Sequence, residues 1–284
     1  MKLFNFYKDN EIHLGIIDED GTARDATAGG YPAIPAAMQT TIDGTYTLDA
    51  IRTAAKNGPV VDIDTVRFAP AVLNPEKILC IGLNYAAHAK ESKLPIPDYP
   101  TLFSKFNNAL NAHKEPIVLP DTAYKYDYEV ELVIVIGKTA HMIDKEDALD
   151  YVFGYTIGND FSARDLQMRT PQWLIGKTFD GFAPLGPYIV PAAEADPAHF
   201  HVQSFVNGEL RQDSNTNDLI FDCATIVSYL SQYMTLKPGD VIFTGTPSGV
   251  ILGYPEDQQV WLKAGDTVTV KIDGIGELTN TLTK

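Results

Sequence analysis

The chain has 284 residues, 45% of them hydrophobic, which is enough to bury the core of one large domain or of one large and one small domain. A formal net charge of −15 at pH 7 argues against nucleic acids and anionic membranes as partners. Cys80 and Cys223 lie in apolar runs, and no stretch has the pattern of a signal peptide or a membrane span, so we expect a soluble, reduced, cytoplasmic protein.

The first part of the chain has the pattern of a small separate unit. Short β-prone runs at residues 2–7, 11–18 and 22–25 are separated by turn residues, which predicts a β-meander. A short helix should then begin after the N-cap candidate Thr47 and end at Gly58-Pro59. We expect residues 1–70 to form a small N-terminal domain and residues 71–284 to form the catalytic domain. Residues 1–70 contain no cluster of candidate catalytic or ligand-binding residues, so we expect them to serve in packing or in dimer formation.

A compact apolar strand at residues 78–83 runs into an alanine-rich segment that is prone to form a helix. His88 and Glu91 stand three positions apart there, on one helical face. A carboxylate beside an imidazole raises its basicity and fixes its tautomer, which suits a general base, although an exposed ion pair has the same spacing. The proline-rich residues 93–100 would allow this helix to act as a lid.

The stretch at residues 128–137 is the feature around which the chain is organised. Its second half is apolar at successive positions, as in a strand that is covered on both faces. Glu129 and Glu131 stand at its start and share one face, because side chains in a strand repeat every second residue. Two buried like charges need a positive partner, and paired carboxylates suit a hard divalent cation. Alternatively, the pair points into water from the strand end.

A third carboxylate follows at the end of another apolar run. Residues 144–151 predict a helix capped by Asp144, and residues 152–160 predict a strand that ends at Asp160. A strand–helix–strand crossover can bring the chain back beside its first strand, which would place Asp160 near Glu129 and Glu131. The other interpretation of Asp160 is a cap for a helix that begins near Ser162.

Cationic and polar groups come directly after this carboxylate. Arg164 and Gln167 lie in a short polar segment, and Lys177 stands among glycines, aromatic residues and prolines. Such a lysine can bind a carboxylate or stabilise an enolate, and the alternative is an ordinary loop lysine. Near the C-terminus, Thr246 supplies a hydroxyl in a glycine-containing segment, which is a weak oxyanion-type signal.

Taken together, these segments resemble the fumarylacetoacetate hydrolase family from about residue 76 onward. The resemblance is carried by five runs in order, GLNYAAHAKE, DYEVELVIVIGK, GNDFSARDLQ, GKTFDGFAPLGP and TGTPSGV. It implies an α+β, β-rich fold, a mixed β-sandwich roll with a small N-terminal β/α domain, and a homodimer. It also implies one Mg²⁺ or Mn²⁺ per subunit, bound by Glu129, Glu131 and Asp160.

The resemblance further implies roles for individual residues. His88 and Glu91 would form the catalytic dyad of a closing lid, and Lys177 would be a catalytic or substrate-anchoring cation. Substrate contacts would come from Arg164, Gln167 and Thr246. Larger members of the family add a fourth carboxylate ligand from the segment before their histidine, where this chain has Asn84. This departure favours a small 2-oxo acid over fumarylacetoacetate.

The expected activity is metal-dependent cleavage of a C–C bond in a small anionic 2-oxo acid through an enolate. Acylpyruvate hydrolysis and oxaloacetate decarboxylation both fit, with His88 activating water in the first. The alternative is an isomerase or hydratase of a dienoic 2-oxo acid in aromatic or sugar-acid catabolism. These reactions share the same site residues, so the sequence leaves them open.

Overall fold

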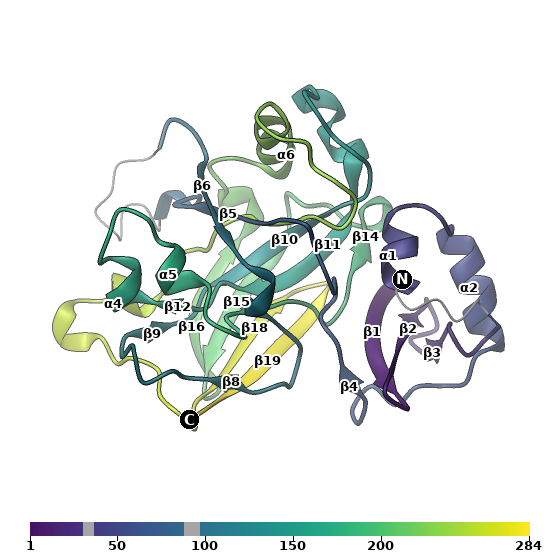
Figure 1. Ribbon diagram of the computed structural model, residues 1–284, viewed down its shortest axis with the longest axis horizontal. Coiled ribbons are helices and arrows are strands. Elements are labelled where there is room, and N and C mark those ends of the chain that lie inside the picture. Colours follow the sequence, from purple (N-terminus) through teal and green to yellow (C-terminus); the bar gives the residue numbers. More distant parts are fainter. Residues whose placement is uncertain (31–36, 88–96) are drawn as a thin grey trace.

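Six strands form the central sheet of the computed structural model, which describes residues 1–30, 37–87 and 97–284 (Figure 1). Only β17 and β5 pair in parallel within this sheet as described, and the other neighbours are antiparallel. Their spatial order is β14 (Val190–Pro191), β11 (Val152–Asn159), β10 (Val130–Ile136), β17 (Val241–Phe243), β5 (Ile78–Gly82) and β6 (Thr101–Lys105).

A five-stranded sheet packs on one face of β10 and β11. Its strands alternate buried and less buried residues, as in β15 and β18, because one face lies against the central sheet. Leu132 and Ile134 of β10 share an apolar core with Val202 and Val270 from this sheet. Its strand order is β16 (Glu209–Asn215), β15 (His201–Val206), β18 (Thr267–Ile272), β19 (Gly276–Thr283) and β8 (Ile117–Val118).

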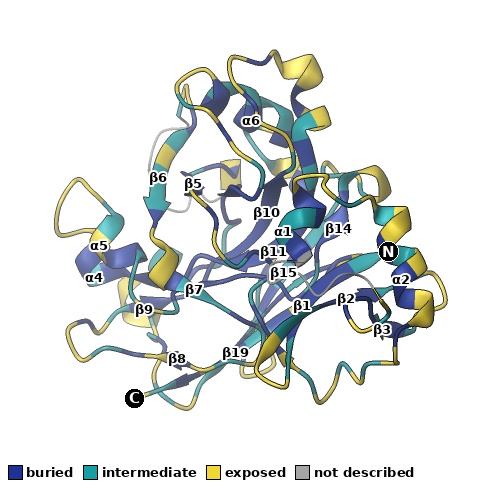
Figure 2. Ribbon diagram, turned by 45° about the vertical axis from the view of Figure 1, so that its right-hand side comes forward, coloured by how far each residue is buried: buried dark blue, intermediate teal, exposed yellow. Residues whose placement is uncertain are grey.

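The opposite face of β10 packs into a second apolar cluster, which also includes residues of the N-terminal sheet. Val133 and Val135 pack there in a cluster that includes Leu3 and Leu14. Each such side chain contributes about 1.5–3 kcal/mol on full burial, so β10 is fixed from both faces. The sheet order is β3 (Ala23–Asp25), β2 (Glu11–Ile17), β1 (Lys2–Lys8) and β4 (Arg67–Phe68). Figure 2 shows the resulting concentration of buried residues in β10 and β11.

Helices are short and lie outside the sheets. Thr47 caps α2 by accepting a hydrogen bond from Ala50 N, and Asp222 caps α6 by accepting one from Thr225 N. The α-helices that lie wholly within the described residues are α1 (Ala37–Ile42), α2 (Leu48–Asn57), α4 (Arg164–Gln167), α5 (Leu174–Lys177) and α6 (Cys223–Ser231). Short 3-10 helices occur at Asn107–Ala109, Lys145–Tyr151, Ala192–Glu194, Thr216–Asp218, Ile251–Gly253 and Glu256–Gln258. Four further short strands are β7 (Leu110–Asn111), β9 (Tyr126–Asp127), β12 (Ser162–Ala163) and β13 (Ala183–Pro184).

The predicted α+β, β-rich fold with mixed sheets is confirmed. Residues 145–151 differ from expectation, since they form a 3-10 helix and the Asp144 side chain accepts no capping hydrogen bond from it. This segment also does not make a parallel crossover, because β10 and β11 are antiparallel neighbours. Both cysteines are buried and free, as expected. The boundary near residue 70 stays a prediction.

None of the helices in the described ranges has the length and apolar composition needed to cross a lipid bilayer.

Candidate active site

Three buried carboxylates converge where β10 begins and β11 ends. Glu129, Glu131 and Asp160 each offer an oxygen, and these oxygens all lie within 4.8 Å of one another. The antiparallel register explains the convergence, because Val130 pairs with Asn159 and therefore places the start of one strand beside the end of the other. The Asp160 N–H donates to the Glu129 carbonyl at 3.0 Å and fixes the two segments together.

Two buried lysines reach this cluster from different elements. Lys177, the last residue of α5, donates to Glu129 Oε2 at 2.8 Å and to Asp160 Oδ2 at 2.6 Å. Lys105, the last residue of β6, forms an ion pair with the other oxygen of Asp160 and donates to the Phe161 carbonyl at 3.0 Å. Burial lowers the pKa of Lys105, whereas at Lys177 the carboxylates of Asp160 and Glu129 overcome the effect of burial and raise the pKa.

Arg164 links the cluster to a fourth buried carboxylate. Its Nε donates to Asp127 Oδ2 at 2.9 Å, and its Nη2 lies 2.6 Å from Glu129 Oε1. Its Nη1 donates to Gln167 Oε1 at 2.9 Å, so Gln167 is held by Arg164 across one turn of α4. Asp127 also accepts from the backbone N–H groups of Ile251 and Leu252 at 2.8 and 3.0 Å. The arginine therefore ties Glu129 to the loop after Val250.

The segment after β17 closes the cluster from another side. Gly245 N donates to Glu131 Oε2 at 2.7 Å. Gly245 has φ +106°, and a Cβ there would lie 2.8 Å from Cβ of Asn84, so this approach requires glycine. Thr246 Oγ1 donates to the Val130 carbonyl at 3.0 Å and accepts from Gln212 Nε2 at 2.8 Å. The hydroxyl proton of Thr246 is thus bound to the backbone.

Within the part of the chain that the structure describes, the charges in this cluster do not balance. Four buried carboxylates, from Asp127, Glu129, Glu131 and Asp160, meet three buried cations, from Lys105, Arg164 and Lys177. Burial and the neighbouring carboxylates of Asp160 and Glu129 raise the pKa of Glu131 well above its ordinary value. Oxygen-only ligands with excess negative charge suit a hard divalent cation such as Mg²⁺ or Mn²⁺. The residues present therefore fit the predicted metal.

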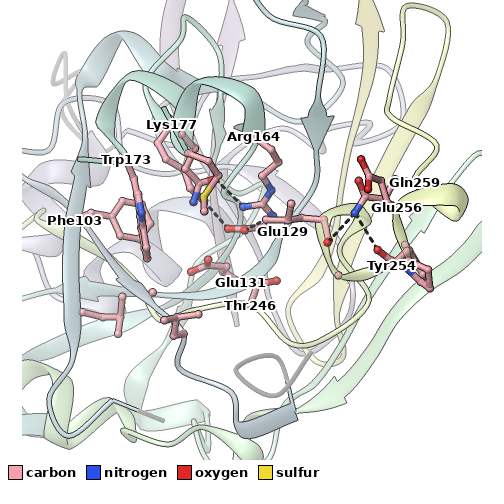
Figure 3. Close-up of a pocket in the computed structure, with 18 residues that line it drawn as sticks. Phe103, Glu129, Glu131, Arg164, Trp173, Lys177, Thr246, Tyr254, Glu256 and Gln259 are labelled. Carbon is pink, nitrogen blue, oxygen red and sulfur yellow. Dashed lines mark hydrogen bonds and ion pairs between the residues drawn. The ribbon is translucent and has the colours of Figure 1, made fainter. Parts of the chain in front are cut away.

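A cavity of about 580 Å³ opens directly onto these groups. In Figure 3, Glu129 lies between Lys177 and Arg164, with Glu131 and Thr246 beside it. Phe103 and Trp173 lie on one side of these charged groups, and Tyr254, Glu256 and Gln259 lie on the other. The cavity thus has a charged floor between an aromatic wall and a polar wall.

Comparison with known proteins identifies the family. Residues 77–283 match the family model described as fumarylacetoacetate (FAA) hydrolase, C-terminal. The chain belongs to the fumarylacetoacetate hydrolase family. This confirms the resemblance that the five sequence runs indicated, and it explains why the carboxylates lie in the part of the chain that the family model covers.

Members of the family with similar sequences and structures carry different activities. The chain is 41% identical to oxaloacetate tautomerase FAHD2B, mitochondrial, from Bos taurus, over 94% of this chain and 86% of that protein. Its structure matches fumarylacetoacetate hydrolase from Exiguobacterium antarcticum at a TM-score of 0.89 and 38% identity, covering 100% and 99% of the two chains. It also matches maleylpyruvate hydrolase from Sphingobium sp. SYK-6 in complex with manganese(II) ion and pyruvate, with TM-score 0.82, 32% identity and coverage of 100% and 99%.

The structure brings most of the predicted site residues of this family member together. Glu129, Glu131, Arg164, Gln167, Lys177 and Thr246 all line the cavity, and Asp160 lies beneath it in contact with Lys177. His88 and Glu91 lie outside the described residues. The metal and substrate roles of these residues stay predictions.

Sequence reasoning missed four residues that the fold places at the site. Lys105 ends a strand in which apolar and polar residues do not alternate regularly, so nothing in the sequence marked it. Asp127 stands two residues before Glu129, and this spacing could have indicated a third carboxylate on the same face. Phe103 and Trp173 come from separate elements and pack edge-to-face, with ring centroids 5.3 Å apart. No sequence spacing joins these two aromatic residues, so their wall becomes visible only in the structure.

Proposed function

We propose that this chain is a divalent-metal-dependent enzyme that forms the enolate of a small 2-oxo acid. The observation that carries the proposal is the buried cluster of Glu129, Glu131 and Asp160, with Lys177 in contact with two of them at the cavity floor. We assign the three carboxylates as ligands of Mg²⁺ or Mn²⁺. Such a cation, when bound, supplies Lewis-acid stabilisation of an enolate.

The side chains around the ligands have separate tasks in this proposal. Lys177 supplies positive charge at the cavity floor, where negative charge develops on the substrate oxygen. Arg164 holds Glu129 in place and, with Gln167, presents polar groups to the substrate. Thr246 lines the cavity next to Glu131, and we keep it as a contact to the substrate carboxylate, for which its hydroxyl proton must turn from the Val130 carbonyl to the substrate.

Keto–enol tautomerisation of oxaloacetate is the reaction with the strongest support. A base removes a proton from C3, and the C2 oxygen gains a proton, so the keto acid becomes its enol; the reverse steps return it. We propose His88, oriented by Glu91, as this base. Support comes from the extent of the similarity to the Bos taurus oxaloacetate tautomerase, which spans 94% of this chain.

Cleavage of a C–C bond is the second candidate, and it uses the same enolate. In acylpyruvate hydrolysis, water activated by His88 adds to the C4 carbonyl, the C3–C4 bond breaks, and pyruvate enolate and a carboxylic acid result. In oxaloacetate decarboxylation the same bond breaks with release of carbon dioxide. The similarity to a maleylpyruvate hydrolase in complex with manganese(II) and pyruvate favours this candidate. Isomerisation or hydration of dienoic 2-oxo acids stays a further prediction.

Side-by-side turnover assays test the proposal and separate its candidates. The purified chain is given oxaloacetate or acetylpyruvate with Mg²⁺, with Mn²⁺, and after treatment with EDTA. Enol absorbance and the formation of pyruvate are followed separately. Metal-dependent enol conversion without pyruvate supports the tautomerase, and metal-dependent pyruvate formation supports cleavage. If neither substrate reacts with either cation, the proposal is wrong.

A His88→Ala variant sharpens the same assay. Loss of about a hundredfold or more in tautomerisation and in hydrolysis is expected, because both need His88 to accept a proton. Decarboxylation should fall much less, since no proton is removed from the substrate to break that bond. Equal losses in all three reactions would contradict the assigned role of His88.

Oligomeric state, partners and cellular location also belong to the proposal. We propose a homodimer that acts on a small anionic acid, with neither nucleic acid nor membrane as partner. The similar Bos taurus protein is named mitochondrial, and a cytoplasmic location for this chain stays a prediction.

A further inference from the structure

The aromatic wall of the cavity stands directly beside the proposed catalytic lysine. Lys177 Nζ lies 5.1 Å from the centroid of the Phe103 ring, and Phe103 packs edge-to-face against Trp173. Both aromatic side chains are half-buried and line the cavity. Aromatic faces of this kind are usually buried against other apolar groups, and these two are left facing the space where a substrate would extend.

Gly82 makes the room for this wall. A Cβ at position 82 would lie 2.5 Å from Cζ3 of Trp173 and 3.7 Å from Cε1 of Phe103. Any larger residue would therefore push the indole out of its present place. Ile81 and Leu83, on either side of Gly82, also line the cavity and extend its apolar surface.

The charges around the cavity disfavour a second anionic group far from the floor. Among the described residues that line it, the cationic ones are Arg164 and Lys177, and both are in ion pairs with buried carboxylates. The opposite wall carries Glu256, which would repel an anion. A distal carboxylate would thus meet either aromatic rings or a negative charge.

The cavity is also larger than a four-carbon acid requires. Its volume of about 580 Å³ lies in the range of pockets that enclose ligands of drug size. A small 2-oxo acid at the charged floor would leave the space along Phe103 and Trp173 unfilled.

We infer that the site accepts 2-oxo acids carrying an aromatic substituent next to the keto acid group, with the ring packed against Phe103 and Trp173. This inference rests on the proposed function, because the floor must hold the 2-oxo acid group for the ring to reach the wall. It adds the substrate class: aryl-substituted 2-oxo acids bind in preference to long dicarboxylic ones.

Titration calorimetry on the Mn²⁺-loaded protein tests the inference with three probes: pyruvate, phenylpyruvate and 2-oxoadipate. Phenylpyruvate should bind at least about tenfold more tightly than pyruvate, because its ring leaves water for an apolar wall. The distal carboxylate of 2-oxoadipate should give no gain over pyruvate. Equal binding of pyruvate and phenylpyruvate would overturn the inference and leave the proposed function intact, whereas absence of binding by all three would defeat both.

Substitutions in the aromatic wall test whether it causes the preference for phenylpyruvate. Phe103→Ala and Trp173→Leu should each lower the ratio of phenylpyruvate affinity to pyruvate affinity by about tenfold, and pyruvate binding in each variant would show that the floor has folded. Gly82→Ala should weaken phenylpyruvate selectively as well, since it displaces the indole. Leu102→Ala, at the exposed neighbour of Phe103 on β6, is the matched control and should change neither constant. An unchanged ratio of the two affinities in all three wall variants would contradict the assignment.

Discussion

Two of the regions that bury carboxylates do so in different ways. In the N-terminal sheet, Asp25 is fully buried and alone. It accepts from Nδ1 of His13 at 2.9 Å, from Nζ of Lys8 at 3.1 Å and from the Ala28 N–H at 2.9 Å. Its charge is therefore matched by neighbours that belong to the same sheet or to the turn after it.

At the ends of β10 and β11, four buried carboxylates meet three buried cations. Glu131 is the clearest point of excess, because its neighbours include Glu129 and Asp160 and it accepts a hydrogen bond from the neutral backbone N–H of Gly245. A carboxylate whose charge is matched stabilises the fold, whereas an excess of buried negative charge indicates a place for a cation that the described residues do not supply.

The largest effect is expected at Glu131. Glu131→Ala removes one of three proposed ligands, so Mn²⁺ binding should be lost and turnover should fall by at least about a thousandfold. Calorimetric titration with Mn²⁺ and steady-state assays measure the two quantities on the same preparation. Full turnover in this variant would show that the cluster is not the metal site.

Removal of Lys105 tests the charge balance itself. Lys105→Met takes a buried cation from Asp160, and the metal-free protein should lose about 3 kcal/mol of unfolding free energy. Added Mn²⁺ should stabilise this variant more than it stabilises the unmodified chain, because the excess negative charge has grown. Urea denaturation with and without Mn²⁺ measures both. An equal gain from Mn²⁺ in the two proteins would contradict the account of the excess charge.

Asp25, whose charge is matched by its neighbours, should affect stability but not Mn²⁺ binding. Asp25→Asn breaks the ion pairs with Lys8 and His13 and should cost about 2 kcal/mol of unfolding free energy. Mn²⁺ binding and turnover should stay as in the unmodified chain, so this variant is also the control for Glu131→Ala. A lower affinity for Mn²⁺ in Asp25→Asn would remove the distinction between the two regions.

A pH-dependent effect is expected where the N-terminal sheet meets β19 of the five-stranded sheet. His113 Nδ1 accepts from the Thr279 N–H at 3.0 Å, and its ring packs edge-to-face on Phe68 of the N-terminal sheet. Burial, with a smaller effect of Lys114, lowers the pKa of His113 from 6.5 to about 4. As the pH falls, His113 is therefore protonated in the unfolded chain before it is protonated in the folded one. The contribution of neutral His113 to the free energy of unfolding is present above pH 6.5 and is lost as the pH falls toward 4.

This loss should amount to about 2 kcal/mol, after allowance for the partial exposure of the ring. In His113→Gln the amide oxygen can accept from Thr279 without titrating, so that part of the pH dependence should disappear. Urea midpoints measured between pH 4 and 7 for both proteins provide the check. Identical pH profiles for the two proteins would show that protonation of His113 does not cause this loss of stability.

The sequence predicted those features that depend on residue spacing within one strand. The apolar run of β10 predicted a strand buried on both faces, and the spacing of Glu129 and Glu131 predicted a shared face. Asp160 reached the expected place by an antiparallel return instead of a crossover. The antiparallel pairing brings the end of β11 beside the start of β10, whereas a parallel crossover would have placed Asp160 beside the end of β10. The proximity of the three carboxylates was therefore predicted correctly from a connection that the structure does not have.

Residues that reach the site across the fold could not be predicted in this way. Lys105 ends β6, the edge strand of the central sheet, where a lysine is ordinarily a solvent-exposed guard against aggregation. It is instead buried against Asp160. The aromatic wall of Phe103 and Trp173 likewise depends on how α5 sits against β6, and no local pattern encodes that packing.

The central claim is that the carboxylate cluster binds a divalent cation through which a 2-oxo acid is held. The most direct test is calorimetric titration of the chain with pyruvate, first without metal and then with saturating Mn²⁺. The account predicts one Mn²⁺ bound per chain and pyruvate binding only in its presence. Pyruvate binding of equal strength without Mn²⁺, or absence of Mn²⁺ binding, would contradict it.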